Sequence, residues 1–277
     1  DNHFTHHVRK WLLDWADEND VNLQLDGLVV RTTLDPELQA AAERAVRRQA
    51  DILQAIADVE WANPNLPRST ATATYTAIRP NIDPFSYYWI TNARALDAFV
   101  RESGAYRSAV EEGEEPAAAL KRLKADRSFM NELKGAKSRL EAGFVAVDPA
   151  SGAVKAWVGS RDFERDQYDH VAQAARQPGS TFKPFVYGAA LERGIPPTQA
   201  YRDVVLEFKG DHGEVWKPTD MDGNSGRSMP MRDGLVFSKN TITAQVSQEV
   251  GVQPIVRLAQ GLGFRQSRLE AVPSLAL

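Results

Sequence analysis

The stretch 144–158, Phe-Val-Ala-Val-Asp-Pro-Ala-Ser-Gly-Ala-Val-Lys-Ala-Trp-Val, decides the fold of this 277-residue chain. Its two ends are short apolar runs, and its middle carries a proline and a glycine. Two such runs around a turn predict an antiparallel strand hairpin. After a polar connection and Pro178-Gly179, apolar residues recur at helical spacing from Ser180 to Arg193. A strand hairpin followed by helices indicates an α+β or α/β sandwich.

The pattern extends in both directions from this stretch. Downstream, the sequence predicts helices at Met231–Phe237, Thr241–Glu249 and Pro254–Leu262. Upstream, it predicts a helix from Phe4 to Trp15, a strand over the β-branched run Gly27–Thr33 and a helix from Leu38 to Leu53. Asp35 is a plausible N-cap of that last helix, with Pro36 as its first residue.

Residues 61–140 contain no pattern that is typical of a catalytic or ligand-binding site. Their first part sets aromatic residues among Asn and Pro, which predicts loops with aromatic anchors; these are Trp61, Tyr75, Tyr87, Tyr88 and Trp89. Residues 92–141 are helical in composition and are interrupted by the acidic run 111–116, which we interpret as a solvated loop.

Composition excludes several classes of function. The chain has no cysteine, which excludes thiolate catalysis, cysteine zinc sites and disulfides. The net charge of −4 gives no basic surface for nucleic acid. No apolar run approaches the roughly 18–20 residues of a membrane-spanning helix. Because the chain opens on Asp1 without a signal peptide, we expect a piece of a longer protein whose anchor or export signal lies upstream.

Ser180 and Lys183 are the first candidates for chemistry. A serine nucleophile must lose its proton as it attacks, so it needs a base within hydrogen-bond reach. Positions i and i+3 share a helix face, which places the amine of Lys183 beside the hydroxyl of Ser180. The N–H of Ser180 at a helix N-terminus is a candidate oxyanion donor. About one such pair is expected by chance in a chain of this size, so an N-capping serine with an exposed lysine is the alternative.

Ser238 and Asn240, in Ser238-Lys239-Asn240, form the second constellation. A hydroxyl and an amide two residues apart at a helix boundary can both face a cleft. Ser238 would relay a proton toward Lys183 or a leaving amine, and Asn240 would bind a peptide substrate and hold the lysine. The alternative is that Asn240 only caps the helix that follows.

Both constellations resemble motifs of one family. The run 177–187, Gln-Pro-Gly-Ser-Thr-Phe-Lys-Pro-Phe-Val-Tyr, resembles the first active-site motif of class A (bifunctional) penicillin-binding proteins, and Ser-Lys-Asn resembles the second. Residues 27–45 resemble the segment that links the glycosyltransferase and transpeptidase domains of these proteins. Residues 144–161 resemble the first strands of the transpeptidase domain. The resemblance covers most of the chain except about 61–130.

The resemblance implies an architecture. Residues 1–60 would be an interdomain linker region, 61–140 a helical or loop connecting region, and 141–277 the N-terminal part of the transpeptidase domain. The implied fold is α+β, of the penicillin-binding/serine β-lactamase-like kind, with an antiparallel sheet and packed helices.

The resemblance also implies a function. Ser180 would attack the carbonyl between the two terminal D-alanines of a peptidoglycan stem peptide, and the acyl group would pass to the amine of a neighbouring stem. Lys183 would be the base, and Ser238 and Asn240 would complete the proton and substrate network. The implied partners are D-Ala-D-Ala stem peptides, β-lactams and other cell-wall synthesis proteins, with no cofactor, metal or nucleic acid. The parent protein would also be a glycosyltransferase, anchored at the extracytoplasmic face of the bacterial inner membrane.

The sequence also departs from the family pattern. No Lys-Thr-Gly or Lys-Ser-Gly occurs, although the family carries this third motif on a late strand. We therefore expect weak or absent labelling by penicillin for the 277-residue chain alone. Two other functions stay open: a serine β-lactamase, which shares Ser-x-x-Lys, and a non-catalytic module that docks cell-wall proteins.

Two further groups of residues have weaker signals. His3, His6 and His7 cluster near the start of the chain, but no carboxylate pattern accompanies them, and we assign no metal site there. Trp216-Lys217-Pro218 lies between the two motifs. It either lines the active-site cleft or has only a packing role.

Overall fold

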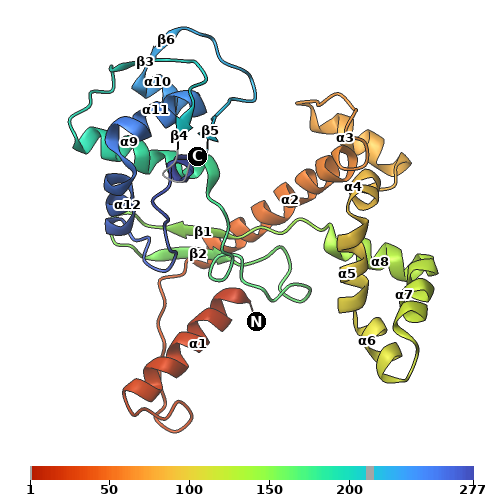
Figure 1. The fold of residues 1–277 in the computed structure, drawn as a ribbon. Coiled ribbons are helices and arrows are strands. Elements are labelled where there is room, and N and C mark those ends of the chain that lie inside the picture. Colours follow the sequence, from red (N-terminus) through yellow and green to blue (C-terminus); the bar gives the residue numbers. More distant parts are fainter. Residues whose placement is uncertain (1, 210–214) are drawn as a thin grey trace. The chain divides into compact units, whose positions relative to one another are not determined.

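Residues 2–209 and 215–277 are described by a computed structural model, in which the chain divides into a first unit, 1–174, and a second unit, 175–277 (Figure 1). The predicted boundaries at residues 60 and 140 stay a prediction. Helices predominate in both units, and every strand pair is antiparallel. This mixture of helices and antiparallel strands is the α+β class that the sequence predicts. No helix of the described residues is long and apolar enough to cross a membrane.

A helix and a strand hairpin pack together in the first unit. Strand β1 (Phe144–Val147) pairs with β2 (Val154–Val158) in antiparallel register, which confirms the predicted hairpin. Helix α2 (Pro36–Glu60) lies against it, and the core between them contains Ala42, Val46, Ala156 and Val158. The predicted cap is confirmed, because the carboxylate of Asp35 accepts from the N–H groups of Glu37 and Leu38.

The side chain of Gln39 acts as an extra strand partner for β2. Its Oε1 accepts from the Trp157 N–H at 2.8 Å, and its Nε2 donates to the Trp157 carbonyl at 2.9 Å. Gln39 is buried, so this amide satisfies two backbone groups that have no water to bond. The contact fixes the register of α2 against the hairpin.

The predicted strand over Gly27–Thr33 is wrong. These residues form no strand and belong to no sheet. Only the end of the segment approaches β2, where the Thr33 hydroxyl donates to the Val154 carbonyl and the Asp35 N–H donates to the Lys155 carbonyl. Val29 is 79% exposed, so the β-branched pattern here has neither a continuous ladder nor a buried face.

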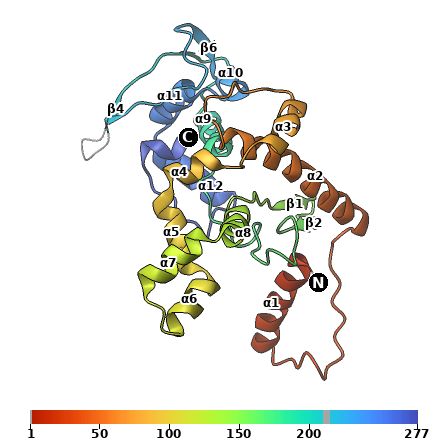
Figure 2. The same cartoon turned by 90° about the vertical axis from the view of Figure 1, so that its right-hand side faces the viewer.

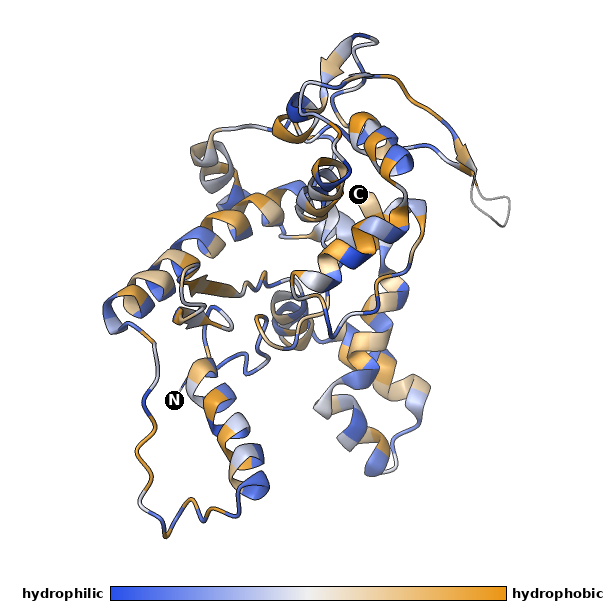
Figure 3. Cartoon of the chain, turned by 90° about the vertical axis from the view of Figure 1, so that its left-hand side faces the viewer, coloured by the Kyte–Doolittle hydropathy of each residue, from blue (hydrophilic) through white to orange (hydrophobic). Residues whose placement is uncertain are grey.

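Helix α1 (His3–Glu18) confirms the predicted N-terminal helix, and hydrophilic and hydrophobic residues alternate along it beside the N mark in Figure 3. The histidines are engaged in aromatic contacts. His3 and His6 pack on Phe163, and His7 stacks on Trp157 with ring centroids 4.8 Å apart.

Short helices make up most of the segment between α2 and β1 (Figure 2). They are α3 (Thr72–Ile78), the 3₁₀ turn η1 (Arg79–Asn81), α4 (Ser86–Thr91), α5 (Ala93–Glu102), α6 (Gly104–Glu111), α7 (Pro116–Ala125) and α8 (Arg127–Lys137). The helical composition of 92–141 is confirmed. The expected aromatic loops are wrong at Tyr75 and at 87–89, which lie in α3 and α4. Trp89 is buried in this segment's own core, so burial overrides the Asn- and Pro-rich context.

The second unit packs its helices around one core. It contains the 3₁₀ turn η2 (Gly179–Phe182), α9 (Lys183–Glu192), α10 (Met231–Val236), α11 (Asn240–Val250), α12 (Val252–Gly261) and the 3₁₀ turn η3 (Pro273–Ala276). The three predicted downstream helices are confirmed as α10, α11 and α12. Phe182, Val186, Ile242 and Val246 are all fully buried between α9 and α11.

Two small sheets that the sequence did not predict flank these helices. They pair β3 (Ala200–Arg202) with β6 (Ser228–Pro230), and β4 (Phe208–Lys209) with β5 (Val215–Trp216). Strands of two or three residues are too short to show a period of alternation.

Candidate active site

The amine of Lys183 is buried at the start of α9 and is held by three oxygens. Its Nζ donates to the Ser238 carbonyl at 2.6 Å, to Ser238 Oγ at 3.1 Å and to Asn240 Oδ1 at 2.6 Å. Lys183 is only 1% exposed. The structure thus brings together three of the four residues that the sequence selected, although Lys183 and Ser238 are 55 residues apart in the chain.

Ser180 lies one turn before Lys183 and is exposed. The predicted α-helix from Ser180 begins instead as the 3₁₀ turn η2, and the α-helix starts at Lys183. Gly179 has a φ of +56°, which suits glycine and turns the chain into η2. Side chains at i and i+3 eclipse in a 3₁₀ helix, so Ser180 and Lys183 still share one face. No hydrogen bond joins these two side chains within the described residues.

Ser238 sits in a strained backbone position. Its φ is +52°, in the left-handed region that glycine usually occupies. The Ser238 N–H donates to the Leu235 carbonyl and the Lys239 N–H donates to the Gly234 carbonyl, which together end α10 in a Schellman motif. A serine at this position costs about 1 kcal/mol relative to glycine. The residue present is the one whose hydroxyl reaches Lys183, which is the kind of strain found at functional sites.

Asn240 does not cap α11 with its side chain. Its Oδ1 accepts from Lys183, and its Nδ2 donates to the Thr219 carbonyl at 2.8 Å. The cap comes from a distant loop, because Asp220 Oδ1 accepts from the Asn240 N–H at 2.6 Å. The side-chain amide is therefore free to orient the lysine, and the alternative of a simple capping asparagine does not describe this structure.

Burial and charge act on the pKa of Lys183 in opposite directions. Burial disfavours the ammonium and lowers the pKa below its ordinary value, and the carboxylate of Asp220 partly opposes that shift. The net direction is downward. This is the direction that a lysine needs to act as a proton acceptor near neutral pH.

The hydrogen-bond inventory of the site fixes where a proton can go. An ammonium has three hydrogens, and the Ser238 carbonyl, Asn240 Oδ1 and Ser238 Oγ accept all three. A neutral amine keeps two hydrogens, which remain on the two carbonyl-type oxygens because these cannot donate. Its lone pair then faces a hydroxyl, so a neutral Lys183 can accept a proton only from a hydroxyl such as that of Ser238 or an approaching Ser180.

Two hydroxyl groups connect the helices that carry Lys183 and Asn240. The Tyr187 hydroxyl bonds Thr243 Oγ1 at 3.0 Å, and Thr243 Oγ1 donates to the Lys239 carbonyl at 2.8 Å. Burial raises the pKa of Tyr187 to about 12. Tyr187 is therefore a neutral hydrogen-bond donor at physiological pH, and it ties α9 to the first turn of α11.

Sequence reasoning missed the acidic residues around α11. Asp203 is fully buried, and its carboxylate accepts from the Thr241 hydroxyl and the Ser225 N–H at 2.7 Å each. Burial disfavours its charge, but these bonds and Lys239 outweigh burial and hold the pKa of Asp203 below its ordinary value. No local pattern reveals such residues, because their partners lie 20 to 40 positions away.

The segment Trp216-Lys217-Pro218 has packing contacts. The ring of Trp216 lies against Phe208, with ring centroids 5.5 Å apart, and Lys217 pairs with Glu207 at 2.6 Å. These contacts belong to the β4–β5 hairpin.

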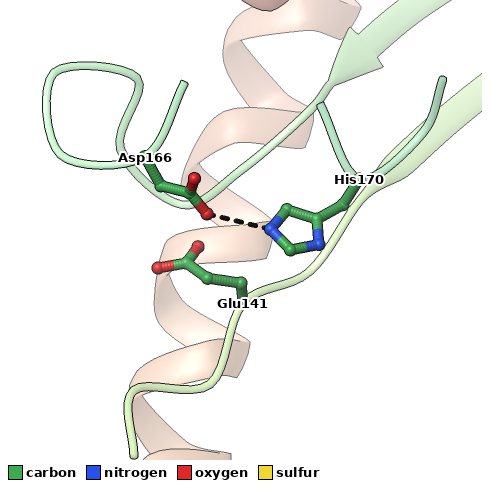
Figure 4. Close-up of side chains that lie close together, drawn as sticks. All are labelled: Glu141, Asp166 and His170. Atoms are coloured by element: carbon green, nitrogen blue, oxygen red, sulfur yellow. Dashed lines mark hydrogen bonds and ion pairs between the residues drawn. The ribbon is translucent and has the colours of Figure 1, made fainter. Parts of the chain in front are cut away.

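One cluster of metal-ligand type lies in the first unit, formed by Glu141, Asp166 and His170 (Figure 4). His170 Nε2 is 2.9 Å from Asp166 Oδ2. The carboxylate of Glu141 is 2.7 Å from Arg139 Nε and also accepts from the Arg161 N–H at 3.0 Å. A guanidinium beside Glu141 already supplies the positive charge that a metal would bring, and we assign no site to the cluster.

Comparisons with known proteins point to one family. The model of the "Penicillin binding protein transpeptidase domain" matches residues 142–273. A penicillin-binding protein 1A from Neisseria cinerea is 40% identical over 140 residues, which are 50% of this chain and 18% of that protein. The penicillin-binding protein 1A of Pseudomonas aeruginosa is 33% identical over 138 residues, 50% of this chain and 17% of that protein.

One solved structure is also similar to this chain. The crystal structure of penicillin-binding protein 1A from Haemophilus influenzae matches 50% of this chain and 20% of that chain, with 30% identity and a TM-score of 0.47. The chain thus spans about a fifth of the length of the relatives that it matches.

Proposed function

We propose that the chain belongs to the penicillin-binding proteins and that it carries the serine acyl-transfer site of a peptidoglycan D,D-transpeptidase. The observation that supports this most strongly is the placement of the buried Lys183 amine, bonded to both Ser238 and Asn240 and one turn after the exposed Ser180. These residues come from the two motifs that the family resemblance selected. A lysine with only a structural role would not need to be held in this way beside an exposed serine.

The proposed acylation follows from the proton inventory of the site. Ser180 Oγ attacks the carbonyl carbon between the two terminal D-alanines and gives its proton to the neutral amine of Lys183. The carbon–nitrogen bond then breaks. The leaving amine of D-alanine takes a proton from Lys183, either directly or through Ser238, whose hydroxyl is 3.1 Å from Nζ. The product is an ester between Ser180 and the stem peptide.

The second half of the reaction returns the site to its starting state. The amine of a neighbouring stem peptide attacks the ester carbonyl and loses a proton to Lys183. The ester carbon–oxygen bond breaks, and Ser180 Oγ takes that proton back. The new amide is the cross-link. Asn240 Nδ2 is engaged with the Thr219 carbonyl, so we assign to Asn240 the positioning of Lys183 before any contact with substrate.

The remaining parts of the proposal concern the whole protein. We assign to it stem peptides ending in D-Ala-D-Ala as substrate, β-lactams as inhibitors that acylate Ser180, and a glycosyltransferase activity elsewhere in the polypeptide. A site on the extracytoplasmic face of the bacterial inner membrane, with an anchor outside residues 1–277, fits that substrate. Other cell-wall synthesis proteins are further proposed partners.

A labelled penicillin tests the proposed nucleophile. We would incubate it with the 277-residue chain and with the full-length protein encoded by its gene, then locate adducts by mass spectrometry. We expect a stable adduct on the peptide that contains Ser180 in the full-length protein, lost in Ser180→Ala and retained in the neighbouring Thr181→Ala. Rapid release of hydrolysed drug would indicate a β-lactamase instead. Absence of any adduct at high drug concentration and long times would leave the non-catalytic docking module.

A further inference from the structure

The loop before Ser-Lys-Asn carries a carboxylate that the proposed mechanism does not use. Asp220 Oδ1 accepts from the Asn240 N–H at 2.6 Å, and its Oδ2 lies 3.1 Å from Thr241 Oγ1, whose single hydrogen is shared with the closer Asp203 Oδ1 at 2.7 Å. The preceding residue, Thr219, accepts from Asn240 Nδ2 through its carbonyl. Two consecutive loop residues thus hold both the backbone and the side chain of Asn240. Lys239, the residue at the N-cap position, makes no side-chain cap.

We propose that Asp220 is the positioning residue of this site: it fixes the first turn of α11 so that Asn240 Oδ1 faces Lys183, and it places a negative charge beside the residue that holds the lysine amine. The inference rests on the proposed function, because it assigns Lys183 the role of base. It goes beyond that function by naming a residue outside both motifs that sets the pH range of acylation.

The geometry gives Asp220 a place that no other acidic residue of the loop has. A helix N-terminus leaves backbone N–H groups unpaired and carries partial positive charge, so a carboxylate there is both bonded and electrostatically favoured. Asp222, two residues later, points to Lys239 Nζ at 3.0 Å and is 75% exposed in its side chain. Asp222 carries the same charge and lies in the same loop, but it does not contact Asn240.

The charges that face Lys183 come from several elements. Asp220 lies on the loop, Asp203 lies behind Thr241, and Lys239 precedes α11 beside Asp203 at 3.9 Å. Tyr187, one turn further along α9, is neutral. Hydrogen bonds to Asp222 raise the pKa of Lys239, so its charge is fixed throughout the relevant range. Burial lowers the pKa of Lys183, and the negative charge of Asp220 opposes that shift.

Two substitutions separate position from charge. Asp220→Asn keeps an oxygen for the Asn240 N–H, and its new amide can donate to Thr241 Oγ1, which still donates to Asp203. This variant removes the charge and preserves the shape. Asp220→Ala removes both. Asp222→Asn is the matched control, because it removes an equal charge two residues away.

The test measures Lys183 and acylation separately in the full-length protein. Lysine labelled with ¹³C at Cε reports the titration of Lys183 by NMR, assigned with Lys183→Arg. Mass spectrometry reports the rate of penicillin acylation at Ser180 from pH 5 to pH 10. For Asp220→Asn we expect the Lys183 titration and the acidic limb of the acylation profile to move together to lower pH, with a plateau rate within about threefold of wild type.

The two other variants complete the comparison. Asp220→Ala should lose tenfold or more of the plateau rate, and Asp222→Asn should titrate like wild type. An unchanged Lys183 titration in Asp220→Asn, or an equal shift in Asp222→Asn, would overturn the inference. A wild-type protein that is not acylated, while the Lys183 titration still moves in Asp220→Asn, would support the electrostatic link and remove the proposed function instead.

Discussion

Asn240 Oδ1 lies 2.6 Å from Lys183 Nζ, in a pocket where the lysine is almost completely buried. The amide oxygen is a neutral acceptor, so it orients the amine without adding a charge that would favour the ammonium. A carboxylate in its place would accept the same hydrogen bond, but its negative charge would favour the protonated form of Lys183. The choice of asparagine over aspartate at this position therefore has a measurable consequence.

Asn240→Asp is expected to slow acylation at neutral pH. The added negative charge at hydrogen-bond distance raises the pKa of Lys183, because it stabilises the ammonium relative to the neutral amine. A higher pKa leaves less neutral lysine at a given pH, so the acidic limb of the acylation profile moves to higher pH. The pH dependence of penicillin labelling at Ser180 measures this shift. A limb that stays in place would mean that Lys183 is not the group that titrates.

Ser238→Gly is expected to stabilise the protein while it slows acylation. Glycine adopts the φ of +52° without the clash of a Cβ, which returns about 1 kcal/mol to the free energy of unfolding. The hydroxyl beside Lys183 is lost, and labelling at Ser180 should slow. Ser238→Ala is the matched variant, because it loses the hydroxyl and keeps the strain. Urea denaturation should rank glycine above wild type and alanine no higher than wild type; equal stability of the two variants would contradict the strain argument.

Gly234→Ala is expected to destabilise the second unit by about 1–3 kcal/mol. A Cβ at Gly234 would lie 2.4 Å from Ile242 Cγ2 and 2.8 Å from the Tyr187 hydroxyl, so α10 would have to move away from α9 and α11. Gly261→Ala serves as control, because nothing lies within 4 Å of its added Cβ. Denaturation curves should separate the two variants, and an unchanged midpoint for Gly234→Ala would show that the three helices are packed less closely.

The sequence predicts those parts of the fold that repeat a local pattern. The hairpin at 144–158, the cap at Asp35 and the helices of the second unit all have a period or a terminal signal that lies within a few residues. The segment Gly27–Thr33 has the composition of a strand, but a strand also needs a partner along its length, and only its last residues approach β2. Composition alone contains no information about that partner.

The candidate site also contains both residues that a local pattern predicts and residues that no local pattern reveals. Ser180, Lys183, Ser238 and Asn240 lie in two short motifs, and the structure places the last three in one network. Asp220 and Asp203 hold that network by capping and bonding α11 from 20 and 38 residues upstream. An isolated aspartate in a loop has no spacing that distinguishes it from a solvated one, so their roles follow only from the folded arrangement.

Gln39→Ala is expected to destabilise the first unit by about 1–3 kcal/mol, because it removes both partners of the Trp157 backbone at a buried position. Glu43→Ala is the control: it removes only the 2.8 Å acceptor of the same Gln39 amide and leaves both Trp157 bonds in place. Hydrogen exchange at the Trp157 amide measures the effect directly. We expect protection to fall in Gln39→Ala and to persist in Glu43→Ala. Equal protection in both variants would mean that β2 is held by β1 alone, and that α2 packs on the hairpin only through its apolar side chains.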